Sequence, residues 1–491
     1  MSNKVKKILI LAVAAILLVA ILAAALLMGG GKTDNGKEGG DTTPGTTDPG
    51  AVLPDVNYGD ADFRISTKSD SIYEVFTDSE DLSDVLDSAL AIRNSNVEER
   101  FGVKITPVIT MENDLDTQVN EIQAAIDVED DFYDICLTYV YSTGRLVVGG
   151  YLIDLTSLNY TDLSRSWWMD DVNKEFAIED TIYAAVGDMS VSLIRTTFAV
   201  FYNRTDGDNM YVDEEKTTTF TDAVVDTVNA GDWTMDYFNN LINPIYDDID
   251  EYEGTTVGDY FGFTADNLTA VDNWNFAFDL PMINQTANGE LECVYNTERT
   301  AAALDKILGL YHSYGVRIDR ECNWRFANGN ALFITSWIDN CLTEYVTMED
   351  TYIILPYPKF DDEQDDYYTG AMDNYSMISV PRTATNLDMI SVITEALNME
   401  SEAVMNEAYY NQALKGKYLE DPITAEMLDI VMNGRKFDMA VMFGGQLEHL
   451  AGLMRNLVQN NSTAFAEKFG DIEEGINQGL ERIIEEYRNN K

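Results

Sequence analysis

The stretch NVEERFGVKITPV, residues 96–108, decides how the chain folds. Its first half ends a run of apolar residues at helical spacing, and Gly102 then stops the helix because glycine tolerates the left-handed backbone of a C-cap. Residues 103–108 alternate in the manner of a strand. Upstream, Phe63–Ser66 is another short strand candidate. The sequence therefore predicts a strand, a helix and a second strand in succession.

The same succession continues downstream. A second amphipathic helix is predicted by four apolar residues at helical spacing, and the stretch YDICLT, residues 133–138, then forms a mostly apolar strand. The helix is marked by Leu115, Val119, Ile122 and Ile126. Strands that alternate with helices indicate an α/β fold with a parallel sheet. Ligands of such sheets bind beyond the carboxyl ends of the strands, which indicates Tyr139 and Tyr141.

The chain is strongly acidic. Its 491 residues include 85 Asp or Glu and 32 Lys or Arg, which gives a net charge of −53. Nucleic acid is excluded as a partner, because phosphate binding needs a basic face. Since 45% of the residues are hydrophobic, the chain still buries large cores, and we interpret the acidity as a solvated surface. An anionic ligand would need a locally basic cleft, for which Arg145 and Arg195 are the first candidates.

The N-terminal segment predicts attachment to a membrane. Residues 1–7 carry three lysines and precede an unbroken apolar run over residues 8–28, long enough to span a bilayer. We predict a cytoplasmic basic tail at 1–7, a membrane anchor at 8–28 and a flexible linker at 29–59. The rest of the chain then lies on the outer face of the plasma membrane; cleavage and secretion are the alternative.

Residues that serve catalysis or metal binding are scarce. His312 and His449 are the only histidines, and both lie in amphipathic helical contexts, so neither a His-based triad nor a multi-histidine metal site is expected. No nucleotide-binding or standard hydrolase motif is present, and we expect no cofactor. An acidic stretch at 246–263 lacks the central glycine and closing glutamate of a calcium loop, so no metal is predicted there. Whether Cys322 and Cys341 form a disulfide stays open.

Aromatic rings, carboxylates and amides do accumulate at strand ends and in loops. Sugars present apolar faces that stack on flat rings, and hydroxyl groups that carboxylates and amides bind. For any single tryptophan, a half-buried core position is the competing interpretation. The predicted ligand-binding residues are Tyr139, Tyr141, Asp188, Trp274, Trp337, Asp339, Asp373 and Asn374.

Seven stretches together resemble the extracellular solute-binding proteins of bacterial sugar ABC transporters, the group that includes the maltodextrin-binding proteins. They follow the family's order over nearly all of residues 60–491, and GKYLEDPITAEMLDIV (416–431) is similar to clostridial, Gram-positive members. A lipidated cysteine after the signal, usual in Gram-positive relatives, is missing. The seven stretches are residues 96–105, 133–158, 181–204, 231–242, 326–340, 352–381 and 409–431.

The resemblance implies a type II periplasmic-binding-protein-like fold, with two α/β lobes, a hinge and a helical C-terminal region. The first lobe would comprise residues 60–190 and 374–412, and the second 191–373 and 413–491. Hinge candidates are then residues 187–189 and 370–374. In the family a tryptophan stacks on the sugar after a strand that corresponds to the one ending at Trp337.

The resemblance also implies a function without catalysis. We expect a monomer that captures a carbohydrate, most simply an oligosaccharide, by cleft closure and delivers it to the permease subunits of an ABC transporter. A surface sensor or adhesion module is the first alternative. A glycoside-active enzyme with an Asp or Glu pair is the second, and turnover of glycans would identify it.

Overall fold

The computed structural model describes residues 53–77, 84–111, 116–210, 219–248, 256, 258–266, 268–286, 289–415 and 422–489. The predicted basic tail and membrane anchor lie outside these residues, as do Asp250 and Glu253 of the acidic stretch. Within the described ranges, no helix has both the length and the apolar character needed to cross a membrane. Both lobes described below belong to the compact unit that spans residues 48–491.

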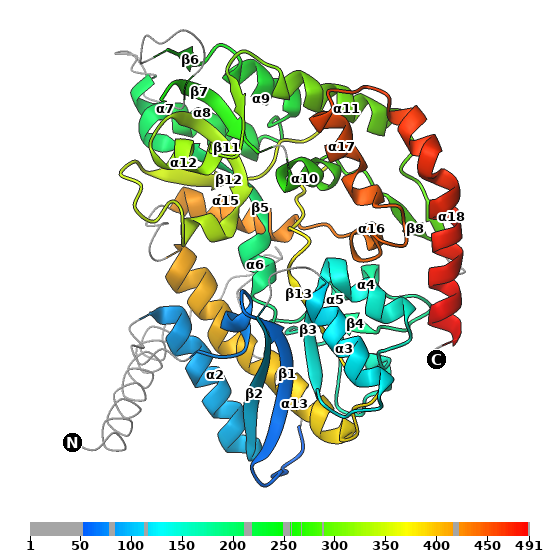
Figure 1. Ribbon diagram of the computed structural model, residues 1–491. Coiled ribbons are helices and arrows are strands. Elements are labelled where there is room, and N and C mark those ends of the chain that lie inside the picture. The colour runs from blue at the N-terminus through cyan, green and yellow to red at the C-terminus, as the bar shows by residue number, and fades with distance from the viewer. Residues whose placement is uncertain are drawn as a thin grey trace, which may run out of the picture. The chain divides into compact units, whose positions relative to one another are not determined.

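The first lobe is built on a five-stranded sheet with the order β2-β1-β3-β13-β4 (Figure 1). β1 pairs with β2 and β3 in parallel, whereas β13 pairs with β3 and β4 antiparallel. The strands are β1 (Ala61–Lys68), β2 (Val103–Thr110), β3 (Ile135–Tyr139), β4 (Ala184–Ala185) and β13 (Ser376–Ser379). The predicted parallel arrangement of the first three strands is confirmed, and the late strand β13 makes the sheet mixed.

The predicted helix stop is also confirmed. Helix α2 (Val85–Phe101) ends at Gly102, whose φ of 59° is left-handed and whose amide bonds to the carbonyl of Glu98. At the other end the Asp84 side chain accepts hydrogen bonds from the amides of Leu86 and Asp87, an N-cap that satisfies two free donors. The residues of the 96–108 stretch therefore form the helix end, turn and strand that their pattern indicates.

The second lobe is built on a six-stranded sheet. The order is β10-β7-β11-β5-β12, with β6 paired to β7, and a separate hairpin joins β8 and β9. The strands are β5 (Phe198–Asn203), β6 (Tyr246–Asp247), β7 (Tyr260–Ala265), β8 (Ile283–Gln285), β9 (Leu291–Cys293), β10 (Val316–Ile318), β11 (Ala331–Trp337) and β12 (Tyr352–Leu355). β7, β11 and β5 are almost fully buried, because helices cover both faces of this sheet.

Helices surround both sheets (Figure 1). The remaining α-helices are α3 (Thr117–Asp127), α4 (Val140–Val148), α5 (Asp170–Glu175), α6 (Ser192–Thr196), α7 (Arg204–Met210), α8 (Phe220–Asn229), α9 (Met235–Ile242), α10 (Thr269–Ala277), α11 (Glu298–Tyr311), α12 (Cys322–Ala327), α13 (Leu387–Glu400), α15 (Pro422–Asn433), α16 (Met439–Met442), α17 (Leu453–Gln459) and α18 (Phe465–Asn489). The 3-10 helices are η1 (Ile72–Glu74), η2 (Leu155–Ser157), η3 (Ile338–Cys341) and η5 (Leu450–Gly452), and η4 (Ser401–Lys415) is a π-helix.

Two antiparallel segments connect the sheets of the two lobes. Thr197 forms a β-bridge with Ala371, the amide of Phe198 bonds to the carbonyl of Gly370, and the amide of Met372 bonds to the carbonyl of Thr196. One segment leads from β4 to β5 and the other returns from β12 to β13. We call residues 187–197 and 370–375 the crossing segments.

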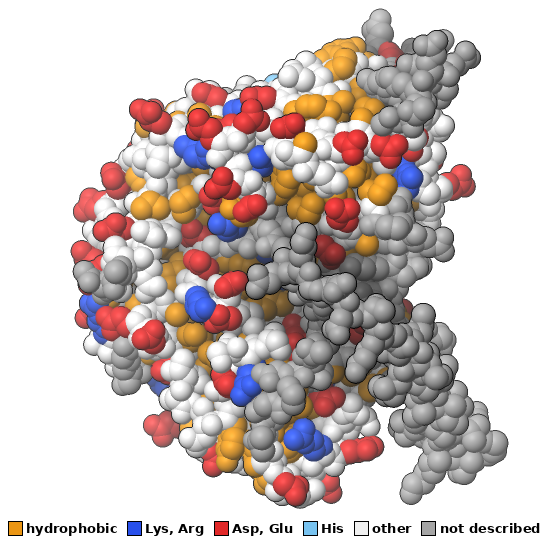
Figure 2. All heavy atoms as spheres, turned by 180° about the vertical axis from the view of Figure 1, so that it is seen from behind, with side chains coloured by type: hydrophobic (Ala, Val, Ile, Leu, Met, Phe, Trp, Pro, Cys, Tyr) orange, Lys and Arg blue, Asp and Glu red, His pale blue; other side chains and the backbone are white. Residues whose placement is uncertain are grey.

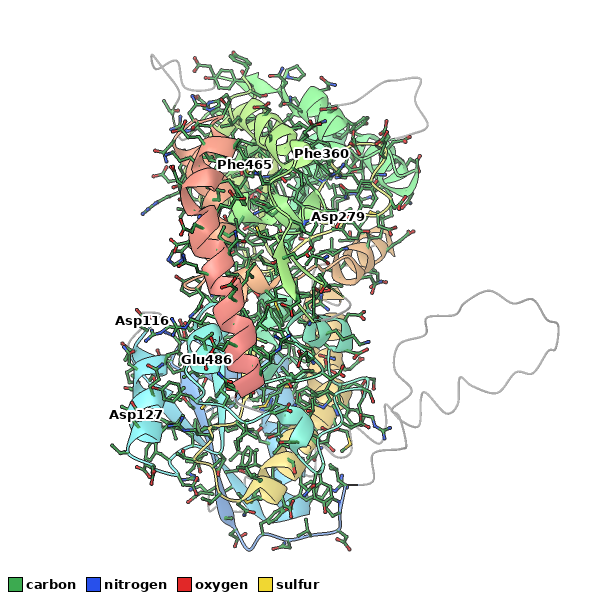
Figure 3. All side chains as sticks on the ribbon, turned by 90° about the vertical axis from the view of Figure 1, so that its right-hand side faces the viewer. Asp116, Asp127, Asp279, Phe360, Phe465 and Glu486 are labelled. Carbon is green, nitrogen blue, oxygen red and sulfur yellow. The ribbon has the colours of Figure 1, made fainter. Side chains whose placement is uncertain are left out.

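The C-terminal helix touches both lobes. Phe465 at its start packs against Tyr295, with ring centroids 5.5 Å apart. Near its end, Tyr487 contacts the ring of Tyr183 and donates a hydrogen bond of 2.9 Å to the carbonyl of Phe176. Figure 3 shows the length of α18 between Phe465 and Glu486. Helix α18, which we predicted to belong to the second lobe, therefore also packs against the first lobe.

The packed chain begins before residue 60. Leu53 is buried in the core of the first lobe, and the amide of Tyr58 bonds to the carbonyl of Phe101. These residues belong to the stretch that we predicted as linker, so residues 53–59 are a correction to that boundary. All four cysteines lie in the described part of the chain, and all are free thiols.

Candidate functional site

A partly open cavity lies where α4 of the first lobe, the crossing segments and α10 of the second lobe meet. Its volume is about 60 Å³, well below the roughly 300–1,000 Å³ of pockets that enclose a small ligand. It is lined by Tyr141, Phe198, Thr269, Asp272, Asn273, Phe276, Met282, Ala371, Met372, Asp373, Ala440, Val441, Gly444, His449, Ala451, Gly452 and Arg455. We call it the interlobe cavity.

Helix α10 contributes one complete face to the cavity. Thr269, Asp272, Asn273 and Phe276 all line it, at the i, i+3, i+4 and i+7 positions that share one side of a helix. Trp274 lies on the other side and is fully buried, with its ring 4.8 Å from that of Tyr357. The helix therefore presents polar groups and one ring to the cavity and an aromatic core to the sheet.

The electrostatics of the cavity are dominated by carboxylates. The guanidinium of Arg455 forms an ion pair of 3.0 Å with Asp272 and also lowers the pKa of Asp266 and Asp373 by its charge. Burial is the larger effect and raises the pKa of all three carboxyl groups. Among the described residues, the side chain of Asp373 has no ion-pair partner of its own. A single positive charge is thus shared by three carboxylates.

Two buried polar atoms of α10 lack hydrogen-bond partners. They are Asp272 Oδ1 and Asn273 Nδ2, and both residues line the cavity. A third orphan, Asn374 Oδ1, follows Asp373 in the crossing segment. A buried polar atom without a partner costs about 1–3 kcal/mol. Asp272 Oδ1 is therefore an acceptor available to a ligand that donates a hydrogen bond, whereas the side-chain amide of Asn273 interacts with the buried phenol of Tyr357 and lowers its pKa against the larger, opposite effect of burial.

The opposite wall pairs an aromatic ring with an imidazole. The Tyr141 hydroxyl lies 3.4 Å from Nδ1 of His449, and the two rings are stacked with centroids 6.3 Å apart. His449 adopts a left-handed backbone, with φ of 54°, ahead of η5. The sequence pattern predicts an amphipathic helix around His449; the structure instead places this residue in a turn at the cavity.

Two further hollows adjoin the cavity. One, of about 310 Å³, shares His449 and runs along α17 to Lys468 and Asp471. The other, of about 220 Å³, shares Phe276 and reaches Asp279 and Lys436. Each of these two hollows therefore shares one lining residue with the interlobe cavity. A larger hollow of about 720 Å³ belongs to the first lobe alone, and no aromatic residue lines it.

Of the predicted residues, Tyr141 and Asp373 line the cavity. The amide of Tyr141 bonds to the Asp373 carbonyl at 3.2 Å, which joins the end of β3 to a crossing segment. Trp337 is half-buried and meets the edge of Phe198, a lining residue, with centroids 6.3 Å apart. It therefore stands one side chain behind the cavity wall.

Asp339 and Asp188 lie elsewhere around the crossing segments. Asp339 is paired with Arg195 at 2.6 Å, and the same guanidinium lies 3.9 Å from the ring centre of Tyr73. Asp188 is buried, which raises the pKa of its carboxyl to about 7, and it bonds to the side chain of Asn406. Neither carboxylate lines the interlobe cavity.

Tyr139 and Arg145 are also engaged outside the cavity. Tyr139 is buried, with Lys68 Nζ 5.1 Å from its ring centre. Arg145 is paired with Asp116, which Figure 3 labels at the start of α3, and bonds to Asn120 at 2.8 Å. Since Arg195 is paired as well, neither arginine that we singled out supplies a free positive charge to the cavity.

The cavity residues that our sequence reading missed are Asp272, Asn273, Phe276, His449 and Arg455. The first three carried a signal, since their polar and aromatic side chains repeat at helical spacing next to the tryptophan that we chose. His449 and Arg455 carried none, because no pattern in residues 439–459 distinguishes them from neighbours on the outer surface. Within the described ranges, no group of three or more His, Cys, Asp or Glu residues could hold a metal ion.

The chain matches known proteins by its structure and not by its sequence. No protein-family model matches the chain, and no curated protein matches it by sequence. Solved structures match over most of their length. UgpB from Mycobacterium tuberculosis, in complex with glycerophosphocholine, is 14% identical with a TM-score of 0.56, and the match covers 87% of this chain and 99% of that one. The chain has the two-lobe fold of solute-binding proteins.

Other structures with this fold were solved with sugars. An ABC substrate-binding protein from Listeria monocytogenes, in complex with cycloalternan, is 12% identical with a TM-score of 0.53 and matches over 88% of this chain and 98% of that one. A cyclo/maltodextrin-binding protein complexed with maltotetraose is 11% identical with a TM-score of 0.53, over 86% and 96%. The predicted α/β fold with two lobes is thus confirmed, while the low identities leave the ligand open.

Proposed function

We propose that the protein binds a carbohydrate in the interlobe cavity, outside the cytoplasm, and delivers it to the permease of an ABC transporter. The observation that carries the proposal is the composition of the cavity wall. Rings of Tyr141, Phe198 and Phe276 provide apolar faces, and the orphaned carboxylate oxygen of Asp272 provides a hydrogen-bond acceptor. Sugars require this combination of stacking surfaces and polar groups.

Capture needs movement of the lobes. A cavity of about 60 Å³ does not admit a sugar ring, so the lobes must separate for entry and close around the ligand. The wall includes α4 from one lobe and α10 from the other, so a bound sugar would contact both and favour the closed state. The two hollows that share His449 or Phe276 with the cavity would accommodate further sugar rings, so we favour an oligosaccharide over a single ring.

A thermal-shift screen of the purified residues 48–491 against mono- and oligosaccharides tests the proposal. A ligand that binds only the native state stabilises it by about 2.7 kcal/mol at a hundredfold excess over Kd. We expect at least one sugar to raise Tm in a concentration-dependent way and none to be cleaved. A panel without any shift would contradict carbohydrate binding, and product formation would favour the enzyme alternative.

A further inference from the structure

The interlobe cavity has an excess of negative charge that the proposed function does not explain. Of its described lining residues, Arg455 carries the one permanent positive charge, whereas Asp272 and Asp373 both line the wall. Asp266 precedes α10, where its carboxylate accepts a hydrogen bond of 2.9 Å from the amide of Leu268. Because Arg455 already pairs with Asp272, two of the three carboxylates remain without a cation of their own.

The surroundings make this excess costly. Asp373 lies in the narrow space between the lobes, where burial and few compensating bonds raise the pKa of its carboxyl group. Charges interact several-fold more strongly in such a site than in water. A cation supplied by the ligand would offset this cost, whereas an anionic ligand would add to it.

The rings around Asp373 suit the same cation. Tyr141, Phe198 and Phe276 line the cavity with it, and burial together with the smaller effect of the Asp373 charge raises the pKa of the Tyr141 phenol. An ammonium group is attracted both by a carboxylate and by the face of an aromatic ring within about 6 Å. A neutral sugar would offer the carboxylate hydrogen bonds from its hydroxyl groups, whereas an ammonium group would also neutralise the negative charge.

We propose that the ligand of the interlobe cavity carries an ammonium group, as in an amino sugar with a free amine, and that Asp373 binds this group. The inference rests on the proposed function and narrows it to a class of ligand. It also gives the orphaned oxygen of Asp272 a partner, because Oδ1 would accept a hydrogen bond from a ligand hydroxyl or amine.

Matched ligand pairs at pH 6.5, where the amine is protonated, test the inference by calorimetry. The pairs are glucosamine against glucose and N-acetylglucosamine, and the fully deacetylated chitobiose against diacetylchitobiose and cellobiose. Glycerophosphocholine against glycerophosphate tests a quaternary ammonium on a non-sugar body. We expect the ammonium member of a sugar pair to bind at least roughly tenfold more tightly, with an advantage that shrinks as salt is added.

The variant Asp373→Asn removes the charge and keeps the shape. We expect it to abolish the preference for the amine, so that the amine and the neutral members of each pair bind with equal affinity. Asp226→Asn, an exposed aspartate of α8, is the matched control with the same change in net charge. Circular dichroism and Tm establish that both variants fold, and Asp373→Glu should restore part of the preference.

The outcomes separate this inference from the proposed function. Equal or tighter binding of neutral sugars by the unaltered protein overturns the ammonium assignment and leaves carbohydrate binding intact. A preference that survives in Asp373→Asn overturns the role of Asp373. If glycerophosphocholine binds and no amino sugar does, the ammonium assignment stands and the carbohydrate assignment is overturned. No binding of any ammonium compound, when the thermal-shift screen does find a neutral sugar, overturns this inference alone, whereas a screen without any shift also overturns the proposed function.

Discussion

At the scale of single residues, one position along a helix decides whether a side chain meets the ligand or the core. Asp272 and Asn273 reach the cavity from α10, while Trp274, the next residue, is fully buried against Tyr357 and Phe278. Each residue turns the helix by about 100°, so neighbours in sequence face different surroundings. Single-residue changes therefore discriminate between the two environments.

Replacement of Tyr141 by alanine removes a ring of the cavity wall. Stacking on a ring contributes about 0.5–1.5 kcal/mol beyond buried area, so we expect affinity for the ligand found by the screen to fall about tenfold. Isothermal calorimetry measures it. Tyr314→Ala, at a ring that is 69% exposed, is the control and should bind normally. Normal binding by Tyr141→Ala would remove this residue from the site.

Glu395 predicts a pH dependence of stability. Its two oxygens accept hydrogen bonds from the indole nitrogens of Trp167 and Trp168 at 2.9 and 2.8 Å, and burial raises the pKa of its carboxyl from 4.5 to about 7. Between these two values the folded protein holds a proton that the unfolded chain releases. Stability therefore falls as pH rises through this window, by an amount on the order of a few kcal/mol.

The variant Glu395→Gln isolates that contribution. The variant cannot ionise at this position. Between pH 5 and pH 8 the free energy of unfolding of the unaltered protein should therefore fall relative to that of the variant. Urea unfolding at several pH values measures it. Asp188 and Asp438, whose pKa values are also raised, are present in both proteins and cancel. If the pH profiles of Glu395→Gln and the unaltered protein are parallel, the prediction is wrong. Glu481→Gln, at an exposed position, is the control, and its profile should be parallel to that of the unaltered protein.

At the scale of elements, the crossing segments and α10 approach each other too closely for a side chain. A β-carbon added at Gly370 would lie 2.4 Å from the ring of Phe276, which itself lines the cavity. The glycine of the second crossing segment is therefore required by this contact, not by its backbone angles. The same approach brings Ala371, Met372 and Asp373 to the cavity wall.

Gly370→Ala should consequently lower the free energy of unfolding by about 1–3 kcal/mol, because the ring or the segment must shift. Gly309→Ala is the matched control, since Gly309 lies inside α11 with nothing within 4 Å of an added β-carbon. That change should stabilise the protein by about 0.5–1 kcal/mol. Chemical denaturation measures the change in the free energy of unfolding for both variants. If the two changes have the same sign, the close contact between Gly370 and Phe276 is not what requires the glycine.

At the scale of the whole molecule, the net charge of −53 is a distributed property. Figure 2 shows acidic side chains spread over the face that it displays, with basic side chains interspersed, and no single acidic patch. Such a charge destabilises the compact state by self-repulsion, which salt screens over about 10 Å at 0.1 M.

The melting temperature should therefore rise as sodium chloride increases from about 10 to about 150 mM, where the Debye length shortens to roughly 8 Å. Differential scanning calorimetry on residues 48–491 measures it. Potassium chloride at equal ionic strength should give the same shift, because screening does not depend on the cation. A Tm that is constant or falls with either salt would contradict a repulsive surface.

The elements themselves were predictable from local pattern. Helix α2, its glycine cap and the strands on either side follow from the spacing of apolar residues over 63–108 and from one left-handed residue. These features depend on neighbours a few positions apart, which the sequence displays directly. Tyr141 was predictable for a related reason, since ligands lie beyond the ends of parallel strands.

The sequence by itself thus determined the α/β class, the first three parallel strands and the acidity of the surface, because periodicity and composition are local or additive. Only the tertiary structure decided which groups share the cavity. His449 and Arg455 reach it from the C-terminal region, Asp272 and Asn273 from α10, and Asp373 from a crossing segment. Their meeting depends on packing between segments hundreds of residues apart, and no periodicity records a contact of that kind.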